Sequence, residues 1–264
     1  MTDQRPTQLF APGLFEGKVV LVTGAAGGVG AAVAELLFSL GARLALTDLD
    51  ASALANWTDR GAVVIPADLR RVDDCEQVVA GTLAELGRVD ALVSCAGVWV
   101  EGDSAAATEA DWDRCIDVNL KGTFFVVSRA LPALRASRGA VVLLSSDAGV
   151  VGNAGAAIYC ASKGGVTVLA KSLARELAPD GVRVTALCPS DIRSPMLTFQ
   201  ATRYGGPDPD AYLRNLLRLY PQGPRARFIE PAEVAAYVAF LLSPAAEPVT
   251  GAAVVMDFGL TAGY

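Results

Sequence analysis

The sequence predicts a single α/β domain, with about seven parallel strands in a doubly wound sheet and helices on both faces. Short β-branched runs alternate with longer helical patterns along the 264 residues, which is typical of parallel strands joined by right-handed crossover helices. No long polar linker interrupts the middle of the chain, so one domain is expected. The 52% hydrophobic and 19% charged residues suit a sheet that is buried on both sides.

The expected elements follow one another from the amino end. Residues 19–22 form an apolar strand, and the first helix, 29–40, ends before Gly41. Residues 72–86 have helical periodicity and are followed by Gly87. The other predicted strands are 43–47, 63–65, 91–94, 141–144, 182–187 and 252–256, and the other helices are 112–134, 157–178 and 233–242.

Two segments fall outside this alternation. Residues 1–14 are polar and lack an apolar signal core, so we expect a flexible tail on a cytoplasmic protein whose single domain covers 15–264. Residues 193–230 are too long and irregular for a simple connection, which predicts a substrate lid. Aromatic side chains in this segment favour packing over a site: Phe199, Tyr204, Tyr212, Tyr220 and Phe228.

The composition excludes several classes of function. The chain has no histidine, which rules out a Ser-His-Asp or Cys-His catalytic group and every His-ligated metal site. The net charge of −6 with scattered basic residues argues against nucleic-acid binding, and no apolar run approaches the ~18 residues of a membrane span. The five cysteines include no CxxC pair, which indicates free thiols and no metal site.

A glycine-rich turn, residues 23–30, lies between the first strand and the first helix. Gly24, Gly28 and Gly30 let the backbone approach a pyrophosphate, whose charge then faces the helix N-terminus. The spacing is GxxxGxG and departs from the GxGxxG pattern, and such a turn alone is weak evidence because many α/β proteins contain one.

Asp48 strengthens this interpretation, because it ends the second strand twenty residues after Gly28. A carboxylate there accepts hydrogen bonds from the adenosine ribose and repels the 2′-phosphate of NADP. Asp50 adds to the repulsion, so the sequence favours NAD. Capping of the following helix is the plain structural alternative for either aspartate, and we expect it for Asp50.

At this point the motifs resemble those of the short-chain dehydrogenases/reductases, from about residue 14 to residue 264. They stand in the family's order; the matching residues are 23–30, Asp68-Leu69, Ser94-Cys95-Ala96-Gly97, Asn119, Ser145-Ser146, Tyr159-Cys160-Ala161-Ser162-Lys163 and 189–194. The resemblance implies a Rossmann domain, a nicotinamide cofactor and hydride transfer to or from a secondary alcohol or ketone. A Tyr-xxx-Lys pair alone has little value, but in register with the other motifs it is specific.

The resemblance also implies a role for each matching catalytic residue. Tyr159 would donate or accept the substrate proton, and Lys163 would hold the nicotinamide ribose near the phenol. Ser146 would hydrogen-bond the substrate oxygen, and Asn119 would anchor a water that links Lys163 to solvent. The alternatives are structural: an ordinary helix tyrosine and lysine, a strand-end cap for Ser146, and a backbone hydrogen bond for Asn119.

The resemblance places further residues around the dinucleotide. Asp68 would contact the adenine amino group, whereas Ile192 and Ser194 would lie against the nicotinamide carboxamide. The full expected cofactor set is Gly24, Gly28, Val29, Gly30, Asp48, Leu49, Asp68, Leu69, Ala96, Gly97, Tyr159, Lys163, Pro189, Ile192 and Ser194.

Electrostatics supports the proposed pair. A free tyrosine has a pKa of about 10, which is too high for an efficient base at neutral pH. A cation ~4 Å away at an effective dielectric constant of ~20 contributes about 4 kcal/mol, or roughly three pKa units. Lys163 together with a positively charged nicotinamide is therefore expected to lower the pKa of Tyr159.

The chain departs from the family pattern at three places. Ser94-Cys95 replaces paired asparagines that support a strand end, and Ser190 follows Pro189 where glycine is usual, which narrows the nicotinamide pocket or adds a hydrogen bond. Phe258 stands where a second glycine is common and is expected at a subunit interface.

The expected substrate pocket is mostly apolar, which favours a cyclic or aromatic secondary alcohol or its ketone. Its predicted lining is Trp99, Ser146, Ala148, Asn153, Tyr159, Ser190 and Met196, with Phe199 and Tyr204 from the lid; core packing is the alternative for Trp99. Two other functions stay open: reduction of a 3-oxoacyl thioester, with Arg138 and Arg175 as basic surface for an acyl carrier, and non-catalytic dinucleotide binding. The resemblance further suggests a homotetramer built on helices 112–134 and 157–178.

Overall fold

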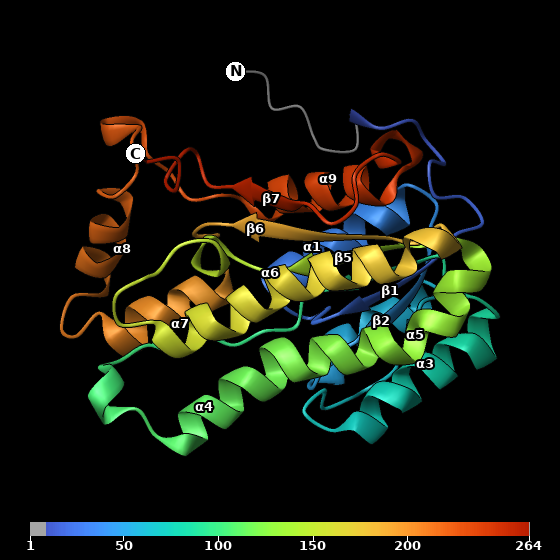
Figure 1. Ribbon diagram of the computed structural model, residues 1–264, viewed down its shortest axis with the longest axis horizontal. Helices are drawn as coiled ribbons and strands as arrows, with labels where there is room; N and C mark the ends of the chain where they lie inside the picture. Colours follow the sequence, from blue (N-terminus) through green and yellow to red (C-terminus); the bar gives the residue numbers. More distant parts are fainter. Residues whose placement is uncertain (1–8, 264) are drawn as a thin grey trace.

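The computed structural model describes residues 9–263 and contains a seven-stranded, all-parallel sheet (Figure 1). The strand order is β3-β2-β1-β4-β5-β6-β7, as expected for a doubly wound sheet. The strands are β1 (Val19–Thr23), β2 (Arg43–Thr47), β3 (Val63–Val64), β4 (Ala91–Ser94), β5 (Ala140–Leu144), β6 (Arg183–Pro189) and β7 (Ala253–Met256).

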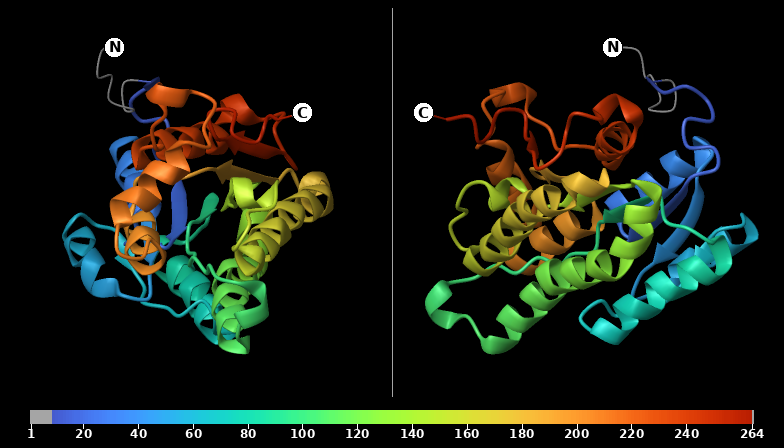
Figure 2. Two further views of the ribbon diagram at one scale, coloured as in Figure 1. Left: turned by 90° about the vertical axis from the view of Figure 1, so that its left-hand side faces the viewer. Right: turned by 45° about the vertical axis from the view of Figure 1, so that its right-hand side comes forward.

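Helices cover both faces of the sheet (Figure 2). One apolar cluster joins the sheet to α1 and α9, and a second joins its other face to α3, α5 and α6. The helices are α1 (Gly28–Ser39), α2 (Ala55–Asp59), α3 (Val72–Leu86), α4 (Glu109–Ile116), α5 (Thr123–Ser137), α6 (Ala157–Leu177), α7 (Pro195–Tyr204), α8 (Pro209–Leu217) and α9 (Pro231–Leu242).

The central strands have apolar side chains on both faces, which explains why they lie inside the sheet. Every residue of β1, β4 and β5 is buried. In the strand register Thr23 stands opposite both Thr47 and Ser94, so three strands end at the same level. Because the strand order reverses between β1 and β4, a crevice opens at their carboxyl ends.

The predicted helix 112–134 is longer and less regular than expected. It begins at Glu109, where Thr108 and Asp111 form a capping box, and α5 ends at Ser137. Between α4 and α5 lies a π-helical segment, Asp117–Gly122, which contains Asn119. Such single-turn widenings concentrate at functional sites.

The prediction of an irregular segment at 193–230 is wrong, because it contains two helices. Ser194 caps α7 by accepting a hydrogen bond from the Leu197 amide, and Asp208 caps α8 by accepting one from the Ala211 amide. In both helices a proline follows the cap at the first helical position, where its missing N–H is no loss. This cap-and-proline pattern was readable in the sequence.

The structure also bears on the amino-terminal segment, the cysteines and Phe258. Residues 1–8 of the expected tail lie outside the described part, while Phe10 and Leu14 pack against the core. All five cysteines are free thiols. Phe258 packs against Tyr220 of its own chain, with ring centroids 6.4 Å apart. Across residues 9–263 we find no helix with the length and apolar character to span a bilayer.

Candidate active site

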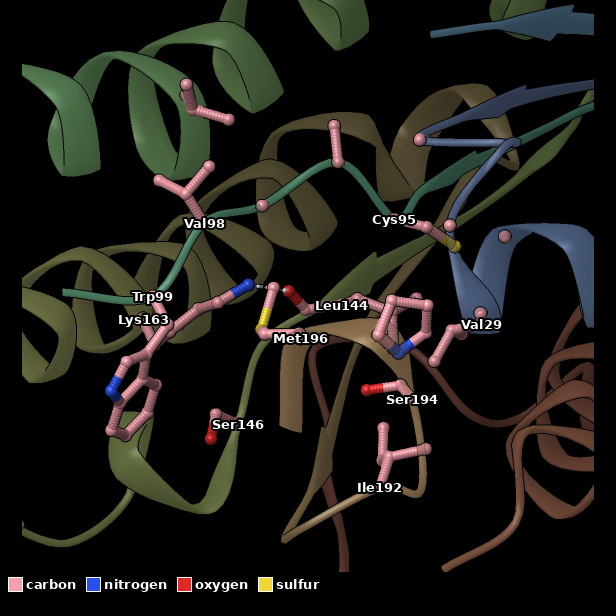
Figure 3. A pocket seen from close by; sticks show the side chains of 18 of the residues that line it. Val29, Cys95, Val98, Trp99, Leu144, Ser146, Lys163, Ile192, Ser194 and Met196 are labelled. Carbon is pink, nitrogen blue, oxygen red and sulfur yellow. Dashed lines mark hydrogen bonds between the residues drawn. The ribbon is translucent and has the colours of Figure 1, made fainter. Parts of the chain in front are cut away.

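A cavity of about 660 Å³ lies at the carboxyl ends of the strands and gathers most of the predicted residues. It extends from the glycine-rich turn and Cys95 at one end to Trp99 and Ser146 at the other (Figure 3). The predicted residues that line it are Gly24, Gly28, Val29, Gly30, Asp48, Leu49, Asp68, Leu69, Ala96, Gly97, Trp99, Ser146, Asn153, Tyr159, Lys163, Pro189, Ser190, Ile192, Ser194 and Met196.

The glycine-rich turn has the shape that a dinucleotide requires. Gly24 adopts φ +65°, and a Cβ there would stand 2.6 Å from the Ala96 nitrogen. A Cβ on Gly30 would stand 2.0 Å from the Gly24 carbonyl oxygen. No side chain caps the N-terminus of α1, so its first amides face the cavity without competition from a protein oxygen. These residues fit a pyrophosphate group.

Asp48 lies in the cavity at the end of β2, as predicted. One carboxylate oxygen accepts a hydrogen bond from the Ala26 amide at 2.9 Å, and the other accepts one from the Leu49 amide at 2.8 Å. These bonds fix the carboxylate beside the glycine-rich turn. Asp50 instead caps the 3₁₀ turn Ala51–Leu54 through the Ser52 amide, which confirms the capping prediction.

The expected adenine end of the cavity contains a basic residue that sequence reasoning missed. Arg70 lines the cavity and forms an ion pair with Asp68 at 2.6 Å. The Arg70 guanidinium holds the pKa of Asp68 below its usual value, mainly through their hydrogen bond. Arg70 was readable in the sequence two residues after Asp68, but their pairing depends on the turn after residue 67.

Tyr159, Lys163 and Ser146 converge at the other end of the cavity, each no more than 7% exposed. Tyr159 and Lys163 lie one turn apart on α6, and Ser146 follows β5. The Lys163 amine donates a hydrogen bond of 2.7 Å to the Leu144 carbonyl (Figure 3). It stands 5.8 Å from the centroid of the Tyr159 ring.

Burial dominates the ionisation of this group. It raises the pKa of Tyr159, against an opposing hydrogen-bonding effect of Ser146, and it lowers the pKa of Lys163 to about 8. Nearby carboxylates, Asp147 and Asp191, raise the pKa of Tyr159 further. The protein's own groups thus leave the pKa of Tyr159 high, and the expected lowering by Lys163 together with a positively charged nicotinamide stays a prediction.

Replacement of the Lys163 amine should stabilise the chain in a pH-dependent way. Holding the amine charged in the folded state costs about 3 kcal/mol, since its pKa falls from 10.5 to about 8. Lys163→Met removes this cost but loses a hydrogen bond of about 1 kcal/mol, so we expect a net gain of about 2 kcal/mol at pH 7. Between pH 8 and 10.5 the wild-type amine loses its proton in the folded state first, so wild-type stability rises and the gain fades.

Thermal unfolding of the cofactor-free protein at pH 7 and pH 10 measures this effect. Lys171→Met is the matched control, because Lys171 lies exposed on the same helix and should show no such pH-dependent gain. A gain for Lys163→Met that is equal at both pH values would contradict the buried-charge explanation.

Asn119 does not line the cavity, but its side chain supports the cavity wall through hydrogen bonds. Its side-chain amide donates to the Val98 carbonyl and to the Ser162 hydroxyl, both at 3.0 Å, and its oxygen accepts from the Val98 amide at 2.7 Å. The side chain is fully buried. It therefore ties the loop after β4 to α6, which is the structural alternative stated for this residue, and the water-anchoring role stays a prediction.

The predicted substrate wall is partly correct. Trp99 stacks on Tyr159, with ring centroids 4.3 Å apart, and lines the cavity with Asn153, Ser190 and Met196. Ala148 does not line it, because its amide is held by the Ser146 and Asp147 side chains and its methyl group packs in a small apolar cluster with Tyr159.

The two lid aromatics that were predicted to face the substrate, Phe199 and Tyr204, lie outside the cavity and pack edge to face against each other. Other residues of α7 line it instead: Met196, Leu197 and Gln200. Tyr212 of α8 donates a hydrogen bond of 2.8 Å to Glu101, which also accepts one of 2.9 Å from the Trp99 indole. The helical segment is thus joined to the pocket wall.

Two cavity-lining carboxylates were missed altogether. Asp147 directly follows Ser146, and Asp191 follows Ser190. Burial raises the pKa of Asp147, and it raises that of Asp191 to about 6. A readable signal existed, since both aspartates follow the carboxyl ends of neighbouring strands, β5 and β6. These two carboxylates add polar groups to a pocket lining that was predicted to be mostly apolar.

Comparison with known proteins agrees with this geometry. The family model described as "Enoyl-(Acyl carrier protein) reductase" matches residues 24–261. An L-fucose dehydrogenase of Bos taurus is 35% identical over 95% of this chain and 92% of its own length. A D-threitol dehydrogenase of Mycolicibacterium smegmatis is 38% identical over 93% of this chain and 94% of its own length.

A solved structure shares the fold as well. A single-residue variant of actinorhodin polyketide ketoreductase with NADPH superposes with a TM-score of 0.86 at 31% identity, covering 92% of this chain and 97% of that one. Family model, relatives and architecture agree over nearly the whole chain. The chain therefore belongs to the short-chain dehydrogenase/reductase family, whose members are dinucleotide-dependent oxidoreductases.

Proposed function

We propose that this protein is an NAD-dependent dehydrogenase that interconverts a secondary alcohol and its ketone. One observation carries the proposal: Tyr159, Lys163 and Ser146 line the same cavity as the glycine-rich turn and Asp48. A dinucleotide bound along the turn would accept or supply the hydride at that end. The names of the fucose and threitol dehydrogenases support a small alcohol as substrate.

Each residue then has a stated task. Tyr159 donates or accepts the proton of the substrate oxygen, and the Ser146 hydroxyl hydrogen-bonds that oxygen. Lys163 would hold the ribose of the cofactor near the phenol. Because the protein's own groups leave the pKa of Tyr159 high, the positive charge needed to lower it comes from the oxidised cofactor together with Lys163.

A screen of secondary alcohols with NAD⁺, followed by NADH absorbance, tests the proposal. Oxidation of at least one cyclic or aromatic secondary alcohol, or reduction of its ketone with NADH, is the expected result. Binding of NADH without turnover of any member of the panel in either direction would favour the non-catalytic regulator instead.

The thioester alternative loses the support that sequence reasoning gave it. Arg138 lies two residues before the strand that begins at Ala140, and Arg175 lies two residues before the end of α6. Both therefore lie at the amino ends of the strands, opposite the cavity. Basic surface at these arginines therefore does not border the cavity that contains Tyr159.

Asp48 should determine the choice between NAD and NADP. We expect the wild type to bind NADH at least about tenfold more tightly than NADPH, because the fixed carboxylate repels the 2′-phosphate. Asp48→Ser should reduce this ratio. Fluorescence titration of both cofactors measures it, with Asp50→Asn as a control of smaller effect, because Asp50 does not line the cavity. Tighter NADPH binding by the wild type would contradict the assignment.

We also propose a cytoplasmic homotetramer. Large apolar side chains remain exposed on the two segments predicted to meet their copies. In segment 112–134 these are Trp112 on α4 and Phe124 on α5, and in segment 157–178 it is Val168 on α6. Burial of these side chains against a second copy would remove them from water.

A further inference from the structure

The substrate end of the cavity contains two carboxylates for which the proposed reaction has no use. Asp147 is 8% exposed and lines the cavity. Its Oδ1 accepts hydrogen bonds from the Ser146 hydroxyl at 2.7 Å and the Ala148 amide at 2.8 Å. Its Oδ2 has no hydrogen-bond partner among residues 9–263. Because Asp147 lines the cavity, this oxygen can accept a hydrogen bond from a ligand there.

Asp191 is held in a defined position by a buried tyrosine. Tyr220, 2% exposed, lies within 2.9 Å of both the Asp191 Oδ2 and the Ser190 hydroxyl. The Asp191 amide donates back to the Tyr220 oxygen at 3.1 Å. The phenol oxygen accepts from the Asp191 amide, and the phenol proton is directed at the Asp191 carboxylate and the Ser190 hydroxyl oxygen. This leaves the Asp191 Oδ1 without a partner in the described chain.

The basic side chains that line the cavity contact groups other than Asp147 and Asp191. Lys163 donates to the Leu144 carbonyl, Arg114 donates to the Trp99 carbonyl at 3.0 Å, and Arg70 pairs with Asp68. Neither Asp147 nor Asp191 has an ion pair in the described part of the chain, and burial together with their mutual repulsion raises the pKa of Asp191 to about 6. The protein thus leaves one oxygen of each carboxylate able to accept a hydrogen bond from a ligand in the cavity.

Hydroxyl groups suit this site better than an ammonium group or an acid. An anionic substrate would meet two carboxylates, and an ammonium group next to the reacting carbon would stand near the Lys163 amine, which is largely charged at neutral pH. A neutral hydroxyl avoids both repulsions and donates one charge-assisted hydrogen bond.

Resting on the proposed function, we infer that the substrate carries a second hydroxyl group next to the reacting one. Asp191, positioned by Tyr220, accepts the hydrogen bond of this second hydroxyl, with Asp147 beside it. Asp191 is thus the specificity-determining residue that selects vicinal diols and larger polyols over simple alcohols.

A matched substrate pair tests the inference. Cyclohexanol and vicinal cis-cyclohexanediol differ by one hydroxyl, and kcat/KM for each is measured with NAD⁺ as cofactor. We expect the wild type to prefer the diol at least about tenfold, as the loss of one charge-assisted hydrogen bond implies. Asp191→Asn should abolish most of this preference, so that the ratio of kcat/KM for the diol to kcat/KM for cyclohexanol falls towards one, while KM for NAD⁺ stays within about twofold; any change in the ionisation of Tyr159 acts on both alcohols and cancels in the ratio.

Two further variants sharpen the test. Asp210→Asn removes an equal charge from the exposed first turn of α8 and should keep the wild-type preference. Tyr220→Phe keeps the Asp191 carboxylate but removes the phenol that positions it, so the preference should fall partway. Tyr220→Phe also carries the test if thermal unfolding shows that Asp191→Asn does not fold.

The outcomes separate the inference from the proposed function. Oxidation of both alcohols with equal kcat/KM, an unchanged preference in Asp191→Asn, or a loss that follows KM for NAD⁺ would overturn the inference alone. A stronger preference for the vicinal aminocyclohexanol than for the diol would also overturn it, in favour of a cation. Failure to turn over any alcohol or ketone would overturn the proposed function and the inference with it.

Discussion

Tyr159→Phe is expected to lower kcat by about a thousandfold, because the variant has no group that can carry the substrate proton. General acid–base catalysis contributes about a hundredfold to ten-thousandfold, and the chain has no histidine to take over. The substitution keeps the ring that stacks on Trp99 at 4.3 Å, so the cavity should keep its shape. NADH binding should therefore stay within about twofold of wild type.

Steady-state rates with the best alcohol of the screen and NADH fluorescence titration measure these two effects. Tyr237→Phe is the matched control, because Tyr237 lies 46% exposed on α9, away from the cavity, and should leave both quantities unchanged. A Tyr159→Phe variant with wild-type kcat would refute the assignment of the acid–base.

Gly30→Ala is expected to combine the largest loss of stability with a loss of cofactor binding. The added Cβ would stand 2.0 Å from the Gly24 carbonyl oxygen, and that contact is with backbone that cannot rotate away. Overpacking of this kind costs on the order of 3 kcal/mol, which lowers the melting temperature of a chain of this size by roughly 6 °C or more. Because the glycine-rich turn must shift, NADH affinity should fall more than about tenfold.

Gly27→Ala is the control within the same turn. Its added Cβ would lie 3.4 Å from the Gly24 oxygen, an ordinary contact, and Gly27 has an extended backbone that alanine adopts readily. Differential scanning calorimetry of the cofactor-free variants should show a near-normal melting temperature for Gly27→Ala. Equal melting temperatures for the two variants would mean that the turn is more plastic than its geometry implies.

The sequence predicted the central strands well because they are buried on both faces and form continuous apolar runs. Residues 91–94 and 43–47 were located to the residue. The helix pair of 193–230 was missed although Ser194-Pro195 and Asp208-Pro209 are good helix starts. The π-helical segment at Asn119 depends on packing against α6, which no local pattern encodes.

The residues of the site were predictable where sequence motifs follow one another in the family's order. They were less predictable where burial determines the ionisation or the hydrogen bonding of a side chain. Tyr159, Lys163 and Ser146 share one cavity, as expected. The high pKa that burial gives Tyr159 was not foreseen, because the sequence gives the spacing to Lys163 but not the depth of the phenol. Asp147 and Asp191 were overlooked because their role depends on which oxygens remain without donors, and only the arrangement of Tyr220, Ser190 and Ala148 determines that.

The shared carboxylate of Glu101 links two events that a catalytic cycle must coordinate. It holds the Trp99 indole, which covers the reacting phenol, and the Tyr212 hydroxyl of α8. An outward movement of α8 would break the hydrogen bond from Tyr212 to Glu101. The Glu101 carboxylate would then be less firmly fixed and would position the Trp99 indole less well. The same movement would open a path for the product and let bulk water reach Tyr159. The Trp99 ring would therefore shield the Tyr159 hydroxyl from bulk water only while α8 keeps its position.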